Sequence, residues 1–158
     1  MSNELKIERV LGAPRDAVWR CWIESELLKR WYCPLPWRVT QADLDLRAGG
    51  RSNIVMEGPN GERHDAKGCY LEVVPKYRLV FTDALLEGFM PVGTPFMVGY
   101  VELADAPGGA TTMVWGARHW SDADRQKHLD MGFEQGWRIA ADQLDALAQD
   151  VAAGRIDA

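Results

Sequence analysis

The longest regular hydrophobic pattern in the chain runs from Ser121 to Val151. Its apolar residues recur at steps of mainly three and four, the spacing that gathers side chains on one stripe of an α-helix: Leu129, Phe133, Gly136, Trp137, Ala140, Leu144, Leu147, Ala148 and Val151. Ser121 can cap this helix, because its hydroxyl can accept a hydrogen bond from a backbone N–H of the first turn. A helix of roughly 28 residues would be about 42 Å long, longer than a small domain is wide. We therefore predict one unbroken helix over residues 121–151, packed along a large surface.

Apolar and polar residues alternate between residues 37 and 119, and turn-forming residues interrupt the alternation. This pattern predicts six strands, near residues 37–47, 50–58, 62–74, 77–83, 96–105 and 110–119. Residues 5–11 predict a further strand at the start of the chain, and short connections make consecutive strands of the later six antiparallel. Between the first strand and the others, the spacing predicts two short helices, one after Pro14 and one at Ser25.

The C-terminal helix is the only predicted element long enough to cover the apolar face of a seven-stranded sheet. Glycines within or beside the predicted strands allow bulges and bends. The pattern therefore predicts an α+β fold in which a curved antiparallel sheet wraps around the long helix. A length of 158 residues with 47% hydrophobic content fits one such domain over residues 1–158.

Composition and charge exclude several classes of partner. The net charge of −5 argues against nucleic acid or an anionic membrane as the main partner. No apolar run approaches the roughly 20 residues that span a bilayer, and the first residues lack the apolar core of a signal peptide, so we expect a cytoplasmic protein without membrane insertion. The three cysteines and three histidines show no metal-ligand spacing, and we predict neither a metal nor another cofactor.

Three stretches of sequence give the chain a family resemblance. They are AVWRCWIESELLKRWYCP at 17–34, GPNGE at 58–62 and HLDMGFEQGW at 128–137. With the predicted order of elements, the chain resembles the helix-grip fold of the START-like (SRPBCC) superfamily, in the branch named after the activator of the heat-shock protein 90 ATPase. The resemblance implies a cavity between the long helix and the curved sheet. Relatives include lipid and hormone carriers, polyketide cyclases and co-chaperone domains, and no catalytic motif common to the branch can be carried over.

Large apolar side chains on the second short helix, the strands and the long helix are expected to meet at such a cavity. The predicted ligand-binding residues are Trp31, Met56, Phe81, Trp115, Phe133 and Trp137. Core packing is the alternative for the seven tryptophans, because each buried ring stabilises the fold by its area alone. Gly136 leaves two alternatives, either space for a ligand or close packing of the backbone.

Polar residues on the predicted hairpin around Asn60 and Gly61 form a candidate catalytic set. If these two residues make the turn, Glu57 lies across from His64, and Tyr70 and Arg51 share their face. Such a set can perform acid–base chemistry on a ligand carbonyl, whereas the alternative is a solvated outer face of the sheet.

Two histidines and one apolar connection lie outside these sets of residues. His119 and His128 flank the start of the long helix, where we expect surface or capping roles. The connection over residues 84–96 is strongly apolar, although surface loops are normally polar. Its residues Leu85, Leu86, Phe89 and Met90 therefore form either a cavity lid or a contact between the subunits of a homodimer.

The function predicted from the sequence is the binding of an apolar or amphipathic small molecule between the long helix and the sheet. One alternative is a stress-related, co-chaperone-like module with a chaperone partner. The other is a cyclase- or isomerase-like enzyme that uses Glu57, His64 and Tyr70.

Overall fold

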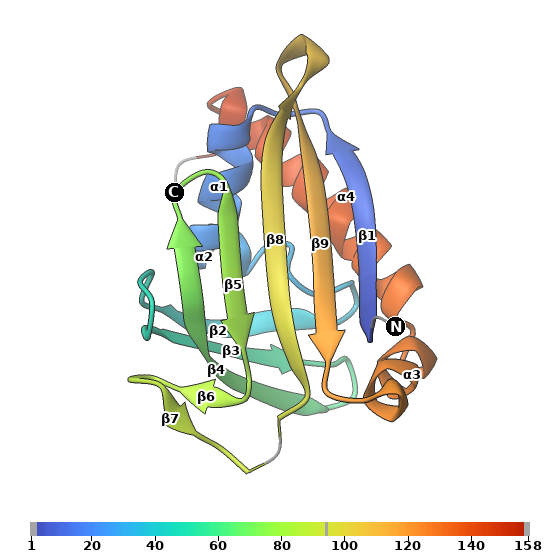
Figure 1. The fold of residues 1–158 in the computed structure, drawn as a ribbon. Coiled ribbons are helices and arrows are strands. Elements are labelled where there is room, and N and C mark those ends of the chain that lie inside the picture. The colour runs from blue at the N-terminus through green and yellow to red at the C-terminus, as the bar shows by residue number, and fades with distance from the viewer. Residues whose placement is uncertain (1–2, 94, 157–158) are drawn as a thin grey trace.

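The computed structural model describes residues 3–93 and 95–156 (Figure 1). Within these residues, one antiparallel sheet has seven strands, in the order β1-β9-β8-β5-β4-β3-β2. Their bounds are β1 (Glu4–Leu11), β2 (Arg38–Leu44), β3 (Arg51–Glu57), β4 (Arg63–Val74), β5 (Arg78–Thr82), β8 (Met97–Ala106) and β9 (Ala110–His119). The predicted antiparallel sheet is thus confirmed, and each predicted strand overlaps an observed one.

The helices lie against one face of this sheet (Figure 1). Their bounds are α1 (Arg15–Ile23), α2 (Ser25–Leu28), α3 (Asp122–Asp130) and α4 (Phe133–Ala152), with a short 3₁₀ turn η1 (Pro107–Gly109) between β8 and β9. The order of elements confirms the predicted α+β helix-grip fold, with α4 as the long C-terminal helix. Among the described residues, no helix combines the length and the apolar character that a membrane span requires.

The prediction of one unbroken helix over residues 121–151 was wrong. The chain turns at Gly132, whose φ of +87° lies in the left-handed region, and this residue separates α3 from α4. Ser121 does cap α3 as expected, because its hydroxyl accepts a hydrogen bond from the N–H of Asp124 at 3.1 Å. The break changes the phase of the helical pattern, so that His128 is buried while Leu129 is exposed.

The connection between β5 and β8 also differs from the expected irregular loop. It contains a two-stranded hairpin, β6 (Leu85–Leu86) and β7 (Met90–Pro91), which forms a small sheet of its own. Figure 1 shows the hairpin at the same end of the molecule as α3.

Aromatic side chains fill much of the core between α1, α4 and the sheet. The rings of Trp22, Trp31 and Trp115 contact one another edge to face, with centroids 4.7 to 5.6 Å apart. Not all seven tryptophans are interior, because Trp120 is 52% exposed just beyond the end of β9. At the middle of the sheet, the Phe81 ring lies against Gly99, and a side chain at position 99 would collide with this ring.

Candidate functional site

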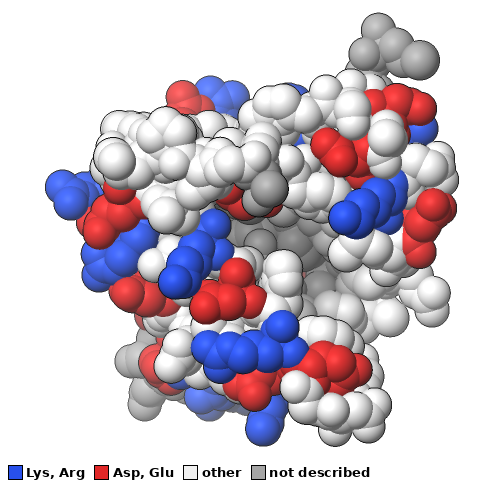
Figure 2. Space-filling model, turned by 90° about the horizontal axis from the view of Figure 1, so that it is seen from below, with Lys and Arg blue, Asp and Glu red and all other residues white. Residues whose placement is uncertain are grey.

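A cavity of about 290 Å³ lies between the sheet and the helices α3 and α4. Its walls come from β3, β4, β5, β8, β9, the segment after α2, the helix α3 and the first turns of α4. Figure 2 views the end of the molecule that carries α3 and the hairpin, and it shows a hollow in this face with charged side chains of both signs around it. A volume of roughly 300 Å³ is at the lower end of the range for pockets that bind small molecules.

The inner wall of the cavity is aromatic. The rings of Trp115 on β9 and Trp137 on α4 stack with their centroids 4.1 Å apart and their planes 20° apart. Gly136 precedes Trp137 on the same wall, and a side-chain carbon added there would meet Pro34 at an ordinary distance of 3.7 Å. Since the backbone at Gly136 is not tightly packed, this glycine provides space in the cavity.

Four of the six predicted ligand-binding residues line the cavity: Met56, Phe81, Trp115 and Trp137. Trp31 does not, because its indole N–H donates to the carbonyl of Cys21 at 2.9 Å and its ring packs into the core behind the cavity. Phe133 does not line it either. It lies one turn before Trp137, and its ring is buried against Trp137 and His128.

The segment after α2 contributes Tyr32, Cys33 and Pro34 to the wall. The amide of Gln143 on α4 donates to the carbonyls of Trp31 and Cys33, each at 2.9 Å, and accepts from the N–H of Leu35 at 3.1 Å. One side chain of the long helix therefore fixes the position of this wall segment. The sequence pattern places Gln143 on no particular wall, because its partners are backbone groups more than 100 residues away.

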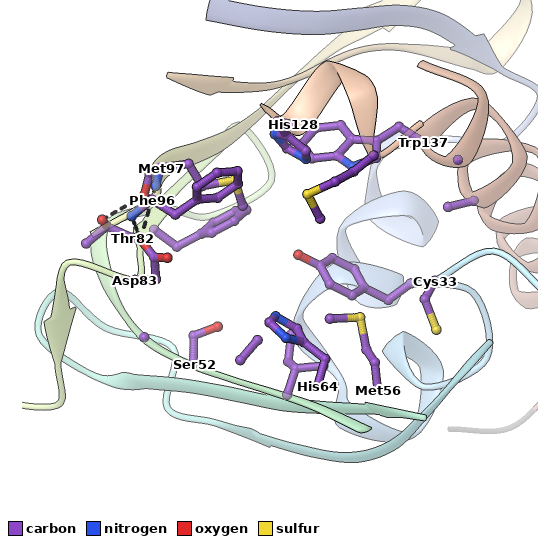
Figure 3. A pocket seen from close by; sticks show the side chains of 18 of the residues that line it. Cys33, Ser52, Met56, His64, Thr82, Asp83, Phe96, Met97, His128 and Trp137 are labelled. Atoms are coloured by element: carbon purple, nitrogen blue, oxygen red, sulfur yellow. Dashed lines mark hydrogen bonds between the residues drawn. The ribbon is translucent and has the colours of Figure 1, made fainter. Parts of the chain in front are cut away.

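The opposite edge of the cavity joins the end of β5 to the start of β8. The carboxylate of Asp83 accepts hydrogen bonds from the N–H groups of Phe96 and Met97, at 2.9 and 3.1 Å. The hydroxyl of Thr82 donates to the carbonyl of Met97 at 2.9 Å. These bonds, drawn as dashed lines in Figure 3, close the base of the segment that carries the hairpin.

The predicted pairing of Glu57 with His64 was wrong by one residue. Glu57 pairs with Arg63, and His64 pairs with Met56. The connection is longer than a two-residue turn, because the N–H of Gly58 donates to the carbonyl of Glu62 and Gly61 adopts a φ of +85°. Neighbouring residues of a strand point to opposite faces, so His64 shares the cavity face with Met56 while Glu57 points to the other face.

The remaining members of the candidate catalytic set divide in the same way. Tyr70 lies on the face of β4 that carries His64, whereas Arg51 pairs with Cys69 and shares the face of Glu57. Arg51 is engaged there in ion pairs with Asp43 at 2.7 Å and Glu87 at 3.0 Å. The structure therefore does not bring the four residues together into one acid–base site.

His119 and His128 are neither surface nor capping residues, contrary to expectation. They are 7% and 8% exposed, and Nε2 of His119 lies 2.9 Å from Nδ1 of His128. Burial, and to a lesser degree the neighbouring His119, lower the pKa of His128 to about 4. Of the two, His128 lines the cavity. Figure 3 shows His128 and His64 on opposite sides of it.

Cys33 is the one cysteine that lines the cavity in the described part of the chain. Burial raises the pKa of its thiol to about 11, so the thiol stays protonated at neutral pH and is a poor nucleophile. The cavity thus presents a few polar side chains, including those of the charged residues Asp83 and Lys67, in a mostly apolar wall. Such a wall is suited to holding a mostly apolar molecule in one orientation.

The four residues of the apolar connection lie beside the cavity and do not line it. Leu85 and Leu86 are half-buried, whereas Phe89 and Met90 are 49% and 61% exposed. The Phe89 ring lies against Gly49, and the N–H of Gly88 donates to the carbonyl of Gly49 at 2.8 Å. The tip of the hairpin is therefore attached to the connection between β2 and β3 by one backbone hydrogen bond and one ring contact.

No group of three or more His, Cys, Asp or Glu side chains that could hold a metal ion occurs among residues 3–93 and 95–156. The three free cysteines are all buried. Cys33 and His128 line the cavity, whereas His119 does not.

One signal in the sequence pointed to the buried histidine of β9. Thr111, Met113, Trp115 and Ala117 occupy alternate positions of this strand and are all buried, and His119 continues their series. No comparable signal existed for His128, because its burial depends on the orientation of α3, which ends before the turn at Gly132 and does not continue into α4.

Comparisons with known proteins agree with this geometry. The family model described as "Activator of Hsp90 ATPase homolog 1-like protein" matches residues 12–149. The solved structure of protein NE0264 from Nitrosomonas europaea is 36% identical, covers 95% of this chain and 96% of its own, and superposes with a TM-score of 0.91. No curated protein matches the chain.

Two further solved structures are similar over most of the chain. Protein Ms6760 from Mycobacterium smegmatis is 27% identical, with 92% of this chain and 90% of its own covered and a TM-score of 0.78. A protein from Arthrobacter aurescens is 26% identical, with 94% and 87% covered and a TM-score of 0.81. The names of these three structures state no ligand or activity.

Proposed function

Because the chain belongs to the family of activator of Hsp90 ATPase homolog 1-like proteins, a START-like (SRPBCC) family, we propose that it binds an apolar or amphipathic small molecule in the cavity between α4 and the sheet. The observation that carries this proposal is the cavity itself, about 290 Å³ in volume and lined by Trp115, Trp137, Phe81 and Met56. A well-packed interior leaves few voids larger than a water molecule, so a space of this size next to stacked indole rings supports a binding role.

Burial of apolar ligand surface supplies the affinity in this proposal, at roughly 25 cal/mol per Å² before the costs of association. The polar groups at the wall orient the ligand, because a polar group of the ligand must lie within hydrogen-bond distance of one of them. Asp83 contributes little to recognition through its Oδ1, since that atom already accepts two backbone hydrogen bonds.

The experiment is a ligand panel of fatty acids, sterols and polyketide-like aromatics, read by tryptophan emission and by melting temperature. Trp115 and Trp137 line the cavity, so a bound molecule should change their emission, and a ligand that binds only the folded state raises the melting temperature by mass action. If no member of the panel changes either signal, the proposal fails.

A matched pair of variants tests whether binding occurs in the cavity. Gly136→Leu places a large side chain on the cavity wall, whereas Gln135→Leu adds a similar side chain at the exposed neighbouring position. We expect Gly136→Leu to weaken binding at least tenfold and Gln135→Leu to leave it unchanged. Equal affinities in the two variants would locate binding elsewhere.

A co-chaperone-like role is the second candidate, and exposed apolar side chains favour it. Phe89 and Met90 on the hairpin and Met131 between α3 and α4 are 49%, 61% and 69% exposed. An exposed apolar group at one end of a molecule is typical of a contact with another protein. Purified Hsp90-type chaperone would hydrolyse ATP faster on addition of this chain and no faster with the Phe89→Ser/Met90→Ser variant. An unchanged hydrolysis rate with the unaltered chain would argue against this role.

The cyclase- or isomerase-like alternative has less support from the geometry. Glu57 lies on the face of the sheet away from the cavity, and the Cys33 thiol is protonated at neutral pH. His64 and His128 remain at the cavity wall, but among the described residues no carboxylate forms a hydrogen bond that would orient either imidazole. Ligand binding without turnover requires no catalytic group beyond those at the cavity wall.

A further inference from the structure

A chain of two hydrogen bonds connects the backbone near the N-terminus to the cavity wall. Nδ1 of His119 lies 3.0 Å from the carbonyl oxygen of Asn3, and Nε2 of His119 lies 2.9 Å from Nδ1 of His128. His128 lines the cavity and His119 does not. The Nδ1 edge of His128 therefore faces away from the cavity, and the edge that carries Nε2 is left to face it.

The carbonyl oxygen of Asn3 determines where each hydrogen lies in this series of hydrogen bonds. A carbonyl oxygen only accepts hydrogen bonds, so Nδ1 of His119 must carry the hydrogen in its contact with Asn3. A neutral imidazole has one N–H, hence Nε2 of His119 is an acceptor and Nδ1 of His128 must donate to it. In the neutral pair, Nε2 of His128 consequently carries a lone pair and no hydrogen.

This lone pair has no partner among the described residues. The fully buried side-chain polar atoms without a partner are the indole nitrogens of Trp22 and Trp115, and Nε2 of His128 is not one of them. It is therefore not sealed in the core, although the residue is only 8% exposed. The rings of Phe96, Phe133 and Trp137 pack around the imidazole with centroids 5.0 to 5.6 Å away. The acceptor is left at the boundary between these rings and the cavity.

We propose that the cavity selects an apolar molecule that carries a hydroxyl or phenol group, and that this group donates a hydrogen bond to Nε2 of His128. The inference rests on the proposed function, because it names the chemical class of the ligand bound there. A methyl ether of the same shape would leave the acceptor unpaired, which is unfavourable in a site of low exposure. An ionised carboxylate would be rejected more strongly, since it offers only further lone pairs.

Protonation of the histidine pair would reverse this selectivity. In the neutral pair, one hydrogen lies on Nδ1 of His119 and one lies between Nε2 of His119 and Nδ1 of His128. An additional proton can therefore bind only at Nε2 of His128, whichever ring carries the charge. Burial and the ring of His119 lower the pKa of His128 to about 4, which keeps the acceptor form at neutral pH. Several other charged or titratable residues lie near His128. β9 contributes His119, and Lys127 precedes His128 on α3 with its Nζ 5.9 Å from the Phe96 ring. His64 and Lys67 of β4 and Asp83 also line the cavity, and Asp83 is bound to backbone N–H groups.

Calorimetric titration of three probes at neutral pH tests the selectivity. The probes are naphthol, its methyl ether and naphthoate, which share one ring system and differ in the polar group. We expect naphthol to bind about tenfold or more tightly than the methyl ether, and naphthoate to bind most weakly. Equal affinities for the three would overturn this inference and leave the proposed function standing, whereas no binding by any of them would overturn both for aromatic ligands.

Variants of the two cavity histidines assign the effect to one atom. His128→Phe keeps an aromatic ring in place but removes the acceptor. We therefore expect naphthol and its methyl ether to bind this variant with about equal affinity. His64→Phe, on the opposite wall, should keep the full preference. If His128→Phe does not fold, His119→Phe serves instead, because it leaves His128 free to change tautomer and should reduce the preference partly. A preference that survives both substitutions contradicts the inference.

A nitrogen-15 spectrum of the imidazole rings tests the proton positions without any ligand. In the free protein at neutral pH, both His119 and His128 should carry their hydrogen on Nδ1. Observation of the Nε2–H form at His128 would overturn the proposal even if a hydrophobic ligand binds in the cavity.

Discussion

Trp115 and Trp137 stack face to face across the boundary between the core and the cavity, with ring centroids 4.1 Å apart. One ring belongs to β9 and the other to the second turn of α4, so the contact ties the long helix to the second strand from one edge of the sheet. On its other side Trp115 packs edge to face on Trp22 and Trp31. The cavity wall is therefore the outer surface of the aromatic core, and changes at this wall should affect stability and binding together.

Substitution of Trp137 by alanine should lower both stability and ligand affinity. The substitution removes a half-buried indole together with its stacking on Trp115 and its contact with Phe133, so we expect the free energy of unfolding to fall by about 2–4 kcal/mol. The matched control is Trp120→Ala, at a position 52% exposed, for which a change within about 0.5 kcal/mol is expected. Urea unfolding followed by circular dichroism measures both. Equal losses in the two variants would show that the stack does not stabilise the fold.

The buried His128 should make stability fall as the solution becomes acidic. Its pKa in the folded state is about 4, whereas an unfolded histidine has a pKa of about 6.5. Between these values the unfolded chain binds a proton that the native state does not, so this contribution is complete above the unfolded pKa and is lost as the pH falls toward the folded one. The loss is on the order of 3 kcal/mol.

Comparison of the unaltered protein with His128→Phe isolates this contribution from other groups that titrate in the same range. His128→Phe should have a shallower dependence of unfolding free energy on pH than the unaltered protein. Urea unfolding at a series of pH values from about 7 to about 4 gives the slopes. Parallel curves for the protein and His128→Phe would contradict burial of a neutral imidazole.

Much of the fold was predictable because its signals are local. Alternation of apolar residues and the turn residues between strands placed the seven strands within a few residues of their observed bounds. The break between α3 and α4 was not predictable in this way. Leu129 and Phe133 are four apart and continue the helical spacing across Gly132, so the pattern contains no sign that the backbone turns there.

The candidate site was less predictable than the fold. The pairing of Glu57 and His64 depended on the number of residues in one turn, and an error of one residue placed the two on opposite faces. The contact between His119 and His128 depends on where α3 lies against β9, a tertiary arrangement that spacing along the chain does not encode. Apolar wall residues such as Trp115 and Trp137 were found because they also belong to the core pattern.

Alanine at two nearby glycines should have opposite effects. At Gly132, a φ of +87° is unfavourable for any residue with a β-carbon, so Gly132→Ala should destabilise the protein by about 1 kcal/mol or more. At Gly136, inside α4, the added carbon meets only Pro34 at 3.7 Å, and alanine favours the helix by up to about 1 kcal/mol. Gly136→Ala should therefore raise the melting temperature while it reduces ligand affinity. Destabilisation by both substitutions would mean that the wall at Gly136 is more tightly packed than its contacts indicate.

The hairpin β6–β7 should act as a lid at the mouth of the cavity. It connects Asp83 and Phe96, which both line the cavity, and Arg51 of β3 holds it through an ion pair with Glu87 at 3.0 Å. The competing proposal is a contact between two subunits, which the exposure of Phe89 and Met90 also allows. Leaving such side chains in water forgoes roughly 1.5–3 kcal/mol for each one that could be buried, so either a ligand or a partner should cover them.

The double substitution of Leu86 and Phe89 by serine separates these proposals. As a lid variant it should bind ligand several-fold more weakly and keep its mass in sedimentation equilibrium, because the cavity mouth is altered and no subunit contact is lost. Val10→Ser, at an apolar position of β1 that is 63% exposed, is the matched control and should change neither quantity. A concentration-dependent mass that the double substitution abolishes would instead assign these residues to a dimer contact. Loss of stability alone, with affinity and mass unchanged, would make the hairpin an ordinary part of the core and contradict both proposals.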